Sequence, residues 1–169
     1  MKLLLTLVVV LSASQLTDRP YELKGEAPGM PLKQFMANHK HAECFNHTAR
    51  QTSCRVYDGV TFAGVTAMTY KGCTSLECSA QGILANFVDG RLVYLSYGVS
   101  PGASQEIIVT LKKKFGEPSA LTKRSATWRN SVGYLYVSEM VVPGPDGSTK
   151  DIATNIDSSL NDRGEGKDI

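Results

Sequence analysis

Apolar and polar positions alternate most clearly near the middle of the chain, in two runs at residues 84–88 and 91–97 that Asp89-Gly90 separates. Asp-Gly readily adopts the positive φ angles of a two-residue turn, so this segment is predicted to form a β-hairpin. The turn should place apolar residues opposite each other, which supports the register from both strands. The expected pairs are Phe87 with Leu92 and Leu84 with Leu95.

Apolar residues recur with helical spacing in two other segments. Pro31 suits the first turn of a helix, and Leu32, Phe35 and Met36 follow at the spacing of one helix face, which predicts a short helix. A longer helix is predicted over residues 103–115, where apolar side chains fall on one side and helix-ending residues follow. These residues are Ile107, Ile108, Leu111, Phe115, Gly116 and Pro118.

The remaining pattern predicts strands on both sides of the second helix. A hairpin is expected within residues 53–70 with Asp58-Gly59 as its turn, and later strands are expected at 126–129, 133–137 and 151–156. The order of helix, strands, helix, strands predicts an α+β fold. Its two helices should pack on one face of an antiparallel meander sheet, in two tandem helix-plus-strands halves.

Two helices on one face leave the other face of the sheet open. Aromatic side chains on an open face suit protein binding, although packing within the sheet is the alternative for each of them. The candidate binding residues are Tyr94, Tyr97, Trp128, Tyr134 and Tyr136.

The N-terminus has the order of a secretory signal, with Met1-Lys2, an apolar run over residues 3–11 and small residues up to Ser14. The apolar run is too short for a membrane span, and cleavage is expected after Ala13 or Ser14. Residues 1–14 are therefore interpreted as a signal peptide, 15–160 as a single α+β domain and 161–169 as a disordered polar tail. We expect a protein of the periplasm or the medium, without a membrane anchor.

Charge and cysteine content narrow the function further. Loss of Lys2 with the signal changes 18 basic residues to 17, against 16 acidic ones, and this balance argues against a nucleic-acid partner. Four cysteines in an exported chain predict two disulfides, and of three possible connectivities we expect the local one, Cys44–Cys54 and Cys73–Cys78. A zinc site of four cysteines is the alternative, but the first pair has the wrong spacing.

All three histidines, His39, His41 and His47, fall within nine residues. Imidazoles could bind a metal or act as a catalytic base, yet their spacing matches no known zinc arrangement. The sequence also has no Gly-x-Ser-x-Gly motif and no phosphate-binding glycine loop. We therefore expect no catalytic residues, metal or cofactor, and a small secreted hydrolase or a metal-binding protein that uses the histidines is the alternative.

Three short segments, Gly29–Phe35, Asn86–Leu92 and Phe115–Pro118, resemble the small subunit of the outer-membrane β-barrel assembly machine. The tandem plan is also similar to that of the secreted β-lactamase inhibitor proteins. The chain departs from the assembly subunit because it lacks that lipoprotein's acylated cysteine. The resemblance implies a protein-binding role without catalysis, so we expect a small exported module that binds an envelope or secreted protein as an assembly factor, inhibitor or immunity-like protein.

Overall fold

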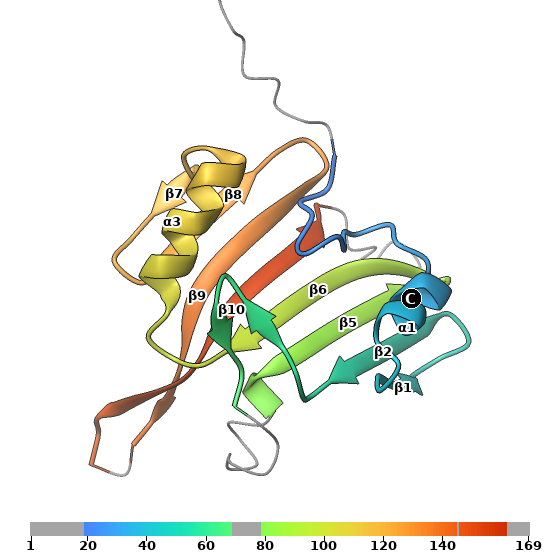
Figure 1. The fold of residues 1–169 in the computed structure, drawn as a ribbon, viewed down its shortest axis with the longest axis horizontal. Coiled ribbons are helices and arrows are strands. Elements are labelled where there is room, and N and C mark those ends of the chain that lie inside the picture. The colour runs from blue at the N-terminus through green and yellow to red at the C-terminus, as the bar shows by residue number, and fades with distance from the viewer. Residues whose placement is uncertain (1–18, 69–78, 145, 162–169) are drawn as a thin grey trace, which may run out of the picture.

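The protein is described by a computed structural model for residues 19–68, 79–144 and 146–161. An antiparallel sheet of eight strands dominates the structure, in the order β1-β2-β5-β6-β10-β9-β8-β7, with β3 and β4 forming a separate small hairpin (Figure 1). The predicted signal peptide and the residues after Asn161 lie outside the described residues. The helices are α1 (Leu32–Asn38) and α3 (Ser104–Phe115). The strands are β1 (Glu43–Asn46), β2 (Gln51–Val56), β3 (Thr61–Phe62), β4 (Val65–Thr66), β5 (Gly82–Val88), β6 (Arg91–Val99), β7 (Ala120–Leu121), β8 (Ser125–Arg129), β9 (Gly133–Pro143) and β10 (Thr149–Leu160).

The predicted α+β fold with two tandem halves is confirmed. The first half runs from α1 through β1, β2, β5 and β6, and the second half runs from α3 through β7, β8, β9 and β10. Each half is an antiparallel meander, and the halves meet where their last strands pair, at β6 and β10. Ile156 of β10 lies opposite Tyr97 of β6 at this junction.

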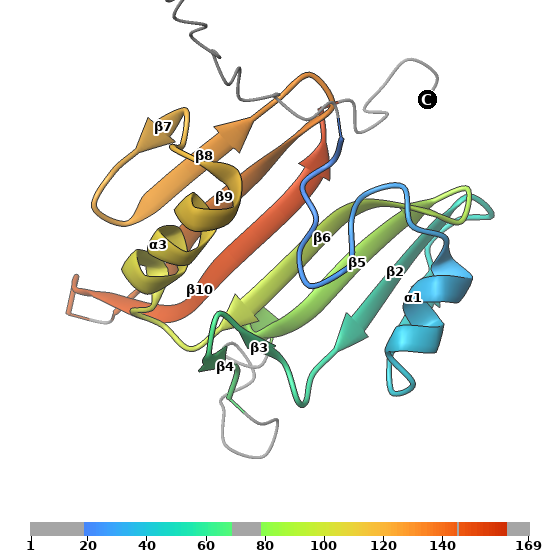
Figure 2. The same ribbon diagram turned by 45° about the horizontal axis from the view of Figure 1, so that its top comes forward.

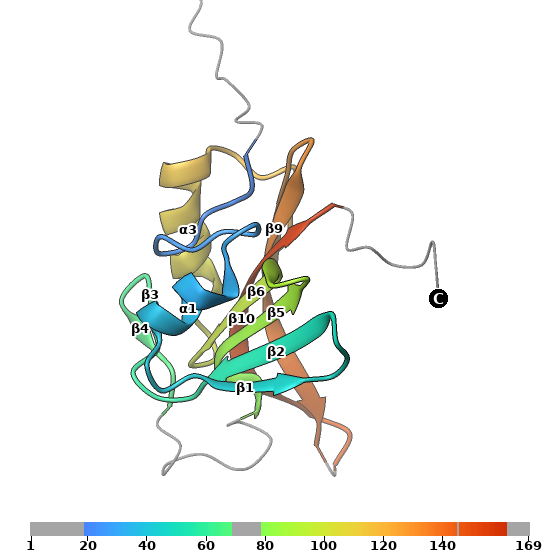
Figure 3. The same cartoon turned by 90° about the vertical axis from the view of Figure 1, so that its right-hand side faces the viewer.

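Both helices lie on the same face of the sheet, together with the β3–β4 hairpin (Figure 3). In Figure 2, α1 lies beside β2 and α3 lies in front of β8 and β9. Burial of Phe35 from α1, and of Ile107 and Leu111 from α3, explains this arrangement, since these side chains are at most 3% exposed. The core therefore lies between the helices and one face of the sheet.

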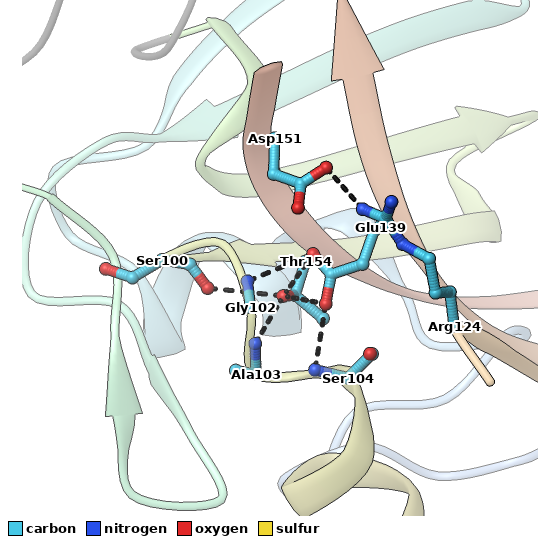
Figure 4. Close-up of polar contacts among 8 residues, drawn as sticks. All are labelled: Ser100, Gly102, Ala103, Ser104, Arg124, Glu139, Asp151 and Thr154. Atoms are coloured by element: carbon cyan, nitrogen blue, oxygen red, sulfur yellow. Dashed lines mark hydrogen bonds and ion pairs between the residues drawn. The ribbon is translucent and has the colours of Figure 1, made fainter. Parts of the chain in front are cut away.

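A carboxylate from the sheet caps the longer helix (Figure 4). Glu139 of β9 accepts hydrogen bonds from the backbone N–H groups of Gly102, at 3.2 Å, and Ser104, at 3.0 Å. The buried hydroxyl of Thr154 lies 2.9 Å from the same carboxylate and accepts from the N–H of Ala103 at 3.1 Å. A carboxylate at the first turn of a helix accepts hydrogen bonds from otherwise unpaired N–H groups and interacts favourably with the helix dipole. This cluster fixes α3 to the second half of the sheet.

The predicted central hairpin forms, with one correction to its register. Asp89 and Gly90 have φ angles of 50° and 71°, and Phe87 lies opposite Leu92 as expected. A β-bulge between Asn86 and Phe87 then shifts the pairing, so that Leu84 lies opposite Ser96 and not Leu95. Because one extra residue moves side chains to the other face, Leu95 is buried in the core and Leu84 faces the open side.

The prediction of a hairpin with Asp58-Gly59 as its turn is wrong. The strand β2 pairs with β1 and β5, and the hairpin turn that does form in this region is Ala63-Gly64, between β3 and β4. Burial of alternate residues of β2, ending in Cys54 and Val56, outweighs the turn preference of Asp58-Gly59.

Cys44 and Cys54 are joined by a disulfide, as predicted, across the β1–β2 pair. Cys54 is fully buried on the face of the sheet that the helices cover. The disulfide therefore links the polar edge strand β1 to the core. The predicted Cys73–Cys78 bond lies outside the described residues.

Candidate functional site

Three of the predicted binding residues lie together on the open face of the sheet. Tyr134 of β9 and Tyr94 of β6 both lie opposite Ser159 of β10, and Tyr136 lies two pairs further along, opposite Asp157. Strand alternation carries each of these side chains away from the helices, and all three are half-buried. We call Tyr94, Tyr134 and Tyr136 the tyrosine belt, which crosses the three central strands.

The other two predicted binding residues, Tyr97 and Trp128, are core residues, and their assignment to an open face is wrong. Each is 2% exposed on the face that the helices cover. The Tyr97 hydroxyl donates to Glu26 at 2.8 Å, and the Trp128 indole N–H donates to the carbonyl of Gly116 at 2.8 Å. Both polar groups are satisfied inside the protein, and neither residue can contact a partner without disruption of the core.

Asp157 lies within the tyrosine belt, at the centre of the open face. Ser96 and Tyr136 flank it on the neighbouring strands. Burial raises the pKa of Asp157, although hydrogen bonds from Ser96 and Tyr94 partly oppose this effect. Its Oδ1 atom is buried and has no hydrogen-bond partner, and the same is true of Oδ1 of Asn155, two residues earlier on the same face. Two hydrogen-bond acceptors without a partner therefore lie two residues apart on the same face of β10.

A hollow with a volume of about 170 Å³ is lined in part by Asn155, and we call it the β6 hollow. Ser96 and Gly98 of β6 line the hollow together with residues 79–81, and the backbone of Ala80 and Gln81 packs directly against Gly98. A Cβ atom at Gly98 would collide with the carbonyl oxygen of Ala80, so glycine is required for this packing. The full lining is Arg55, Ser79, Ala80, Gln81, Gly82, Ile83, Leu84, Tyr94, Ser96, Gly98, Met140 and Asn155.

The covered side carries a different cluster, centred on Glu26. This carboxylate is 3% exposed and accepts hydrogen bonds from Tyr97 at 2.8 Å and Asn38 at 3.4 Å, and it lies 2.6 Å from Nε2 of His39. Burial alone would raise the pKa of Glu26, but the hydrogen bonds from His39 and Tyr97 outweigh it and hold the pKa below its usual value. Burial and the neighbouring Glu26 raise the pKa of Tyr97 well above its usual range.

The structure does not bring the three histidines together. His39 and His41 line a cleft of about 530 Å³ with Glu43 and Asp58, whereas His47 lies at the β1–β2 hairpin, where Nε2 is 2.9 Å from the hydroxyl of Ser53. Within residues 19–68, 79–144 and 146–161, no three histidine, cysteine or acidic side chains are placed to hold a metal ion.

A second cleft, of about 390 Å³, contains His39, Glu26 and Tyr97 on the covered side. Thr61 also lines it, but the Thr61 hydroxyl is paired with that of Thr66 at 3.2 Å. Among the described residues, His39 has no serine, threonine or cysteine side chain within hydrogen-bond distance. The cleft thus contains a histidine oriented by a carboxylate, and residues 19–68, 79–144 and 146–161 supply no activated nucleophile beside it.

Several polar residues of these clusters were missed by sequence reasoning. The positions of Glu26, Asn155 and Asp157 depend on segments that are far apart in the chain. The hydrogen bond between Glu26 and Tyr97, for example, joins residues 71 positions apart. One signal was present for Asp157: it directly follows Ile156, the last residue of the strand predicted at 151–156, and strand alternation would place its side chain on the opposite face.

Comparison with family models, with curated proteins and with solved structures returns no match to this chain. In the part of the chain that the structure describes, no helix has the length and hydropathy needed to cross a membrane.

Proposed function

We propose that this chain is a small exported protein-binding module that contacts an envelope or secreted protein through the open face of its sheet. The tyrosine belt around Asp157 carries this proposal. Tyrosine is enriched in binding hot spots because it supplies a large apolar ring and a hydroxyl at low entropic cost. Desolvated acceptors without partners destabilise a free protein, and a bound partner could supply the missing donors.

Export is part of the proposal and has its own support. The N-terminal sequence has the order of a secretory signal, and the Cys44–Cys54 disulfide suits an oxidising compartment such as the periplasm or the medium. The tandem helix-plus-strands plan is the feature on which the resemblance to the β-lactamase inhibitor proteins rests. An assembly factor, an inhibitor and an immunity-like protein all share this mode of action, which is binding without catalysis.

Site-specific photo-crosslinking tests the proposed surface. A benzophenone side chain would replace Tyr134 or Tyr136, and the matched control would carry it at Val109, an α3 residue that is 53% exposed. Each protein would be irradiated with the envelope fraction and the medium of the organism that makes it. We expect one discrete adduct from both tyrosine positions and none from position 109.

Two outcomes would contradict the proposal. In one, neither tyrosine position yields an adduct in either fraction. In the other, position 109 yields the same adduct, because α3 lies on the far side of the sheet from the tyrosine belt.

The cleft beside His39 supports a second candidate, a small secreted hydrolase. The supporting observation is the contact between His39 and the buried Glu26, which would orient the imidazole as a general base. Hydrolysis of a panel of nitrophenyl esters and glycosides above the buffer rate, lost in His39→Gln and kept in Tyr136→Phe, would favour this candidate. A wild-type rate equal to that of buffer would remove it.

A further inference from the structure

We propose that two copies of this chain pair edge to edge through β1, which would join their sheets into one continuous sheet. β1 is the outermost strand of the first half (Figure 3). Within residues 19–68, 79–144 and 146–161, no strand pairs with its outer side. Unpaired backbone groups at such an edge are a template for another strand. This edge is separate from the tyrosine belt, so a second copy bound there would add to the proposed function.

The hydrogen bonds of the β1–β2 hairpin identify which backbone groups of β1 point outward. The N–H of His47 donates to the carbonyl of Gln51 at 2.9 Å, so these two residues form a hydrogen-bonded pair. Hydrogen-bonded and non-hydrogen-bonded pairs alternate along an antiparallel ladder. The pair of Cys44 and Cys54 is therefore non-hydrogen-bonded, and its short Cα–Cα distance of 4.1 Å agrees with this. The N–H and C=O groups of Cys44 and Asn46 consequently point away from β2, toward the outer edge.

An exposed aromatic side chain lies on the same strand. Phe45 is 58% exposed and is not part of the hydrophobic core. The disulfide directs the side chain of Cys44 to the covered face, where Cys54 is buried. Strand alternation therefore carries Phe45 to the open face at the edge of the sheet. Burial of this ring would be favourable, and the fold of one copy does not bury it.

The free backbone groups favour one register for the two strands. Cys44 would exchange both backbone hydrogen bonds with Asn46 of the second copy, and two-fold symmetry repeats this exchange. Registers shifted by one pair would need the N–H groups of Ala42 or Thr48, which already donate within the chain. In the favoured register Phe45 lies opposite Phe45 of the second copy, in a non-hydrogen-bonded pair where side chains approach closely. Each exposed ring thus covers the other.

The charged side chains are compatible with the same register. Glu43 would lie opposite His47 of the second copy, and the symmetry forms this contact twice. Among the described residues, no cation lies within ion-pair distance of the Glu43 carboxylate. Nε2 of His47 already lies 2.9 Å from the hydroxyl of Ser53, so Nδ1 is the nitrogen left for the carboxylate. Beyond the strand, Lys40 would approach Arg50, whose guanidinium already forms an ion pair. No like charges face each other within the strand pair itself.

Sedimentation velocity of the purified chain, with the Cys44–Cys54 disulfide intact, tests the inference. Because the strand pair is short, we expect a reversible monomer–dimer equilibrium with a dissociation constant on the order of 100 µM. Phe45→Glu would place two carboxylates opposite each other on the symmetry axis and should weaken the dimer by about tenfold or more. Leu121→Glu is the matched control, because Leu121 is 52% exposed on β7 at the other edge of the sheet, and it should leave the equilibrium unchanged.

An exchange of charges tests the register. Glu43→Lys places an ammonium group opposite the imidazole of His47, and His47→Glu places a carboxylate opposite Glu43. Each variant alone should therefore dimerise more weakly than wild type. In an equimolar mixture, the introduced lysine and the introduced glutamate face each other, and the second pair is the same as in wild type. The mixture should form a heterodimer at least as stable as the wild-type dimer, and a fluorescent label on one variant would detect it.

Three outcomes would overturn the inference. In the first, the wild-type chain remains monomeric up to about 1 mM. In the second, a dimer forms but Phe45→Glu leaves it unchanged or Leu121→Glu weakens it equally. In the third, the mixture of Glu43→Lys and His47→Glu dimerises no better than either variant alone. Urea unfolding of dilute Phe45→Glu should match wild type, since the ring is exposed in the monomer, and this shows that loss of the dimer is not loss of the fold.

Discussion

The two faces of the sheet each contain a carboxylate, and the environments of these two carboxylates shift their pKa values in opposite directions. On the covered face, Glu26 is surrounded by His39, Tyr97 and Asn38, and its pKa is held below the usual value. On the open face, Asp157 keeps an oxygen without a partner, and burial raises its pKa. The carboxylate on the covered face thus stabilises the fold. The carboxylate on the open face destabilises it, and a ligand could supply the missing hydrogen-bond donor. Four predictions test this difference.

The largest effect is expected when Glu26 is removed. Glu26→Ala leaves the buried Tyr97 hydroxyl and the His39 ring without their acceptor, so we expect a loss of about 3 kcal/mol in the free energy of unfolding, measured by urea denaturation. Glu22→Ala is the control, since Glu22 forms an exposed pair with Lys114 and should change stability by less than about 0.5 kcal/mol. Equal effects of the two variants would argue against a stabilising role for the Glu26 cluster.

A pair of tyrosine variants compares the faces with one chemical change. Tyr97→Phe removes a donor from Glu26 and should cost about 1.5 kcal/mol. Tyr136→Phe removes a hydroxyl from the open face and should cost less than about 0.5 kcal/mol. Urea unfolding of both variants measures the difference, and a reversed order would mean that the tyrosine belt belongs to the structural framework.

Asp157→Asn is expected to stabilise the free protein. The amide keeps the shape of the side chain but removes the desolvated charge, and we expect a gain of about 1 kcal/mol at pH 7 in thermal or urea unfolding. Asp151→Asn, which breaks an exposed ion pair with Arg124, should not stabilise. A clear loss of stability in Asp157→Asn would show that the carboxylate is needed for folding.

The pH dependence of stability gives the smallest signal, because the two carboxylates act in opposite directions in the wild-type protein. The lowered pKa of Glu26 adds stability above its unfolded-state pKa, and this is lost as the pH falls through the folded-state value. The raised pKa of Asp157 removes stability as the pH rises from its unfolded-state value through its folded-state value.

Unfolding measured from pH 3 to pH 7 should therefore show that Glu26→Gln falls below wild type as the pH rises and that Asp157→Asn rises above it. Asp157→Asn should converge on wild type at the acid end, where the raised pKa of Asp157 leaves its carboxyl group protonated. The deficit of Glu26→Gln should shrink as the pH falls toward the lowered pKa of Glu26. Parallel curves would contradict the assigned shifts.

Local signals explain what the sequence could predict. The Asp89-Gly90 turn and the apolar stripe of α3 depend on neighbouring residues, and both elements formed as expected. The β1 strand, Glu43–Asn46, is polar and short, so no local pattern predicts it. It is held by its pairing with β2 and by the disulfide. The bulge beside Phe87 likewise depends on packing and moved Leu95 into the core.

The candidate site was predictable in part for the same reason. Alternation along a strand indicates which residues share a face, and the predicted residues Tyr134 and Tyr136, two positions apart, do share the open face. It does not indicate which face the helices will cover, so Tyr97 and Trp128 were misplaced. The contacts of Glu26 and Asp157 depend on the pairing of distant strands, which a single sequence does not reveal.

The position of β10 has a consequence for how the chain folds. This strand lies between β6 and β9 at the centre of the sheet, yet among the strands that the structure describes it is the last to be synthesised. The two halves cannot join until it is present, so contacts of long sequence separation must form late and folding is expected to be slow. A nascent chain that stops short of residue 149 would lack this central strand, and β6 and β9 would become two additional exposed sheet edges.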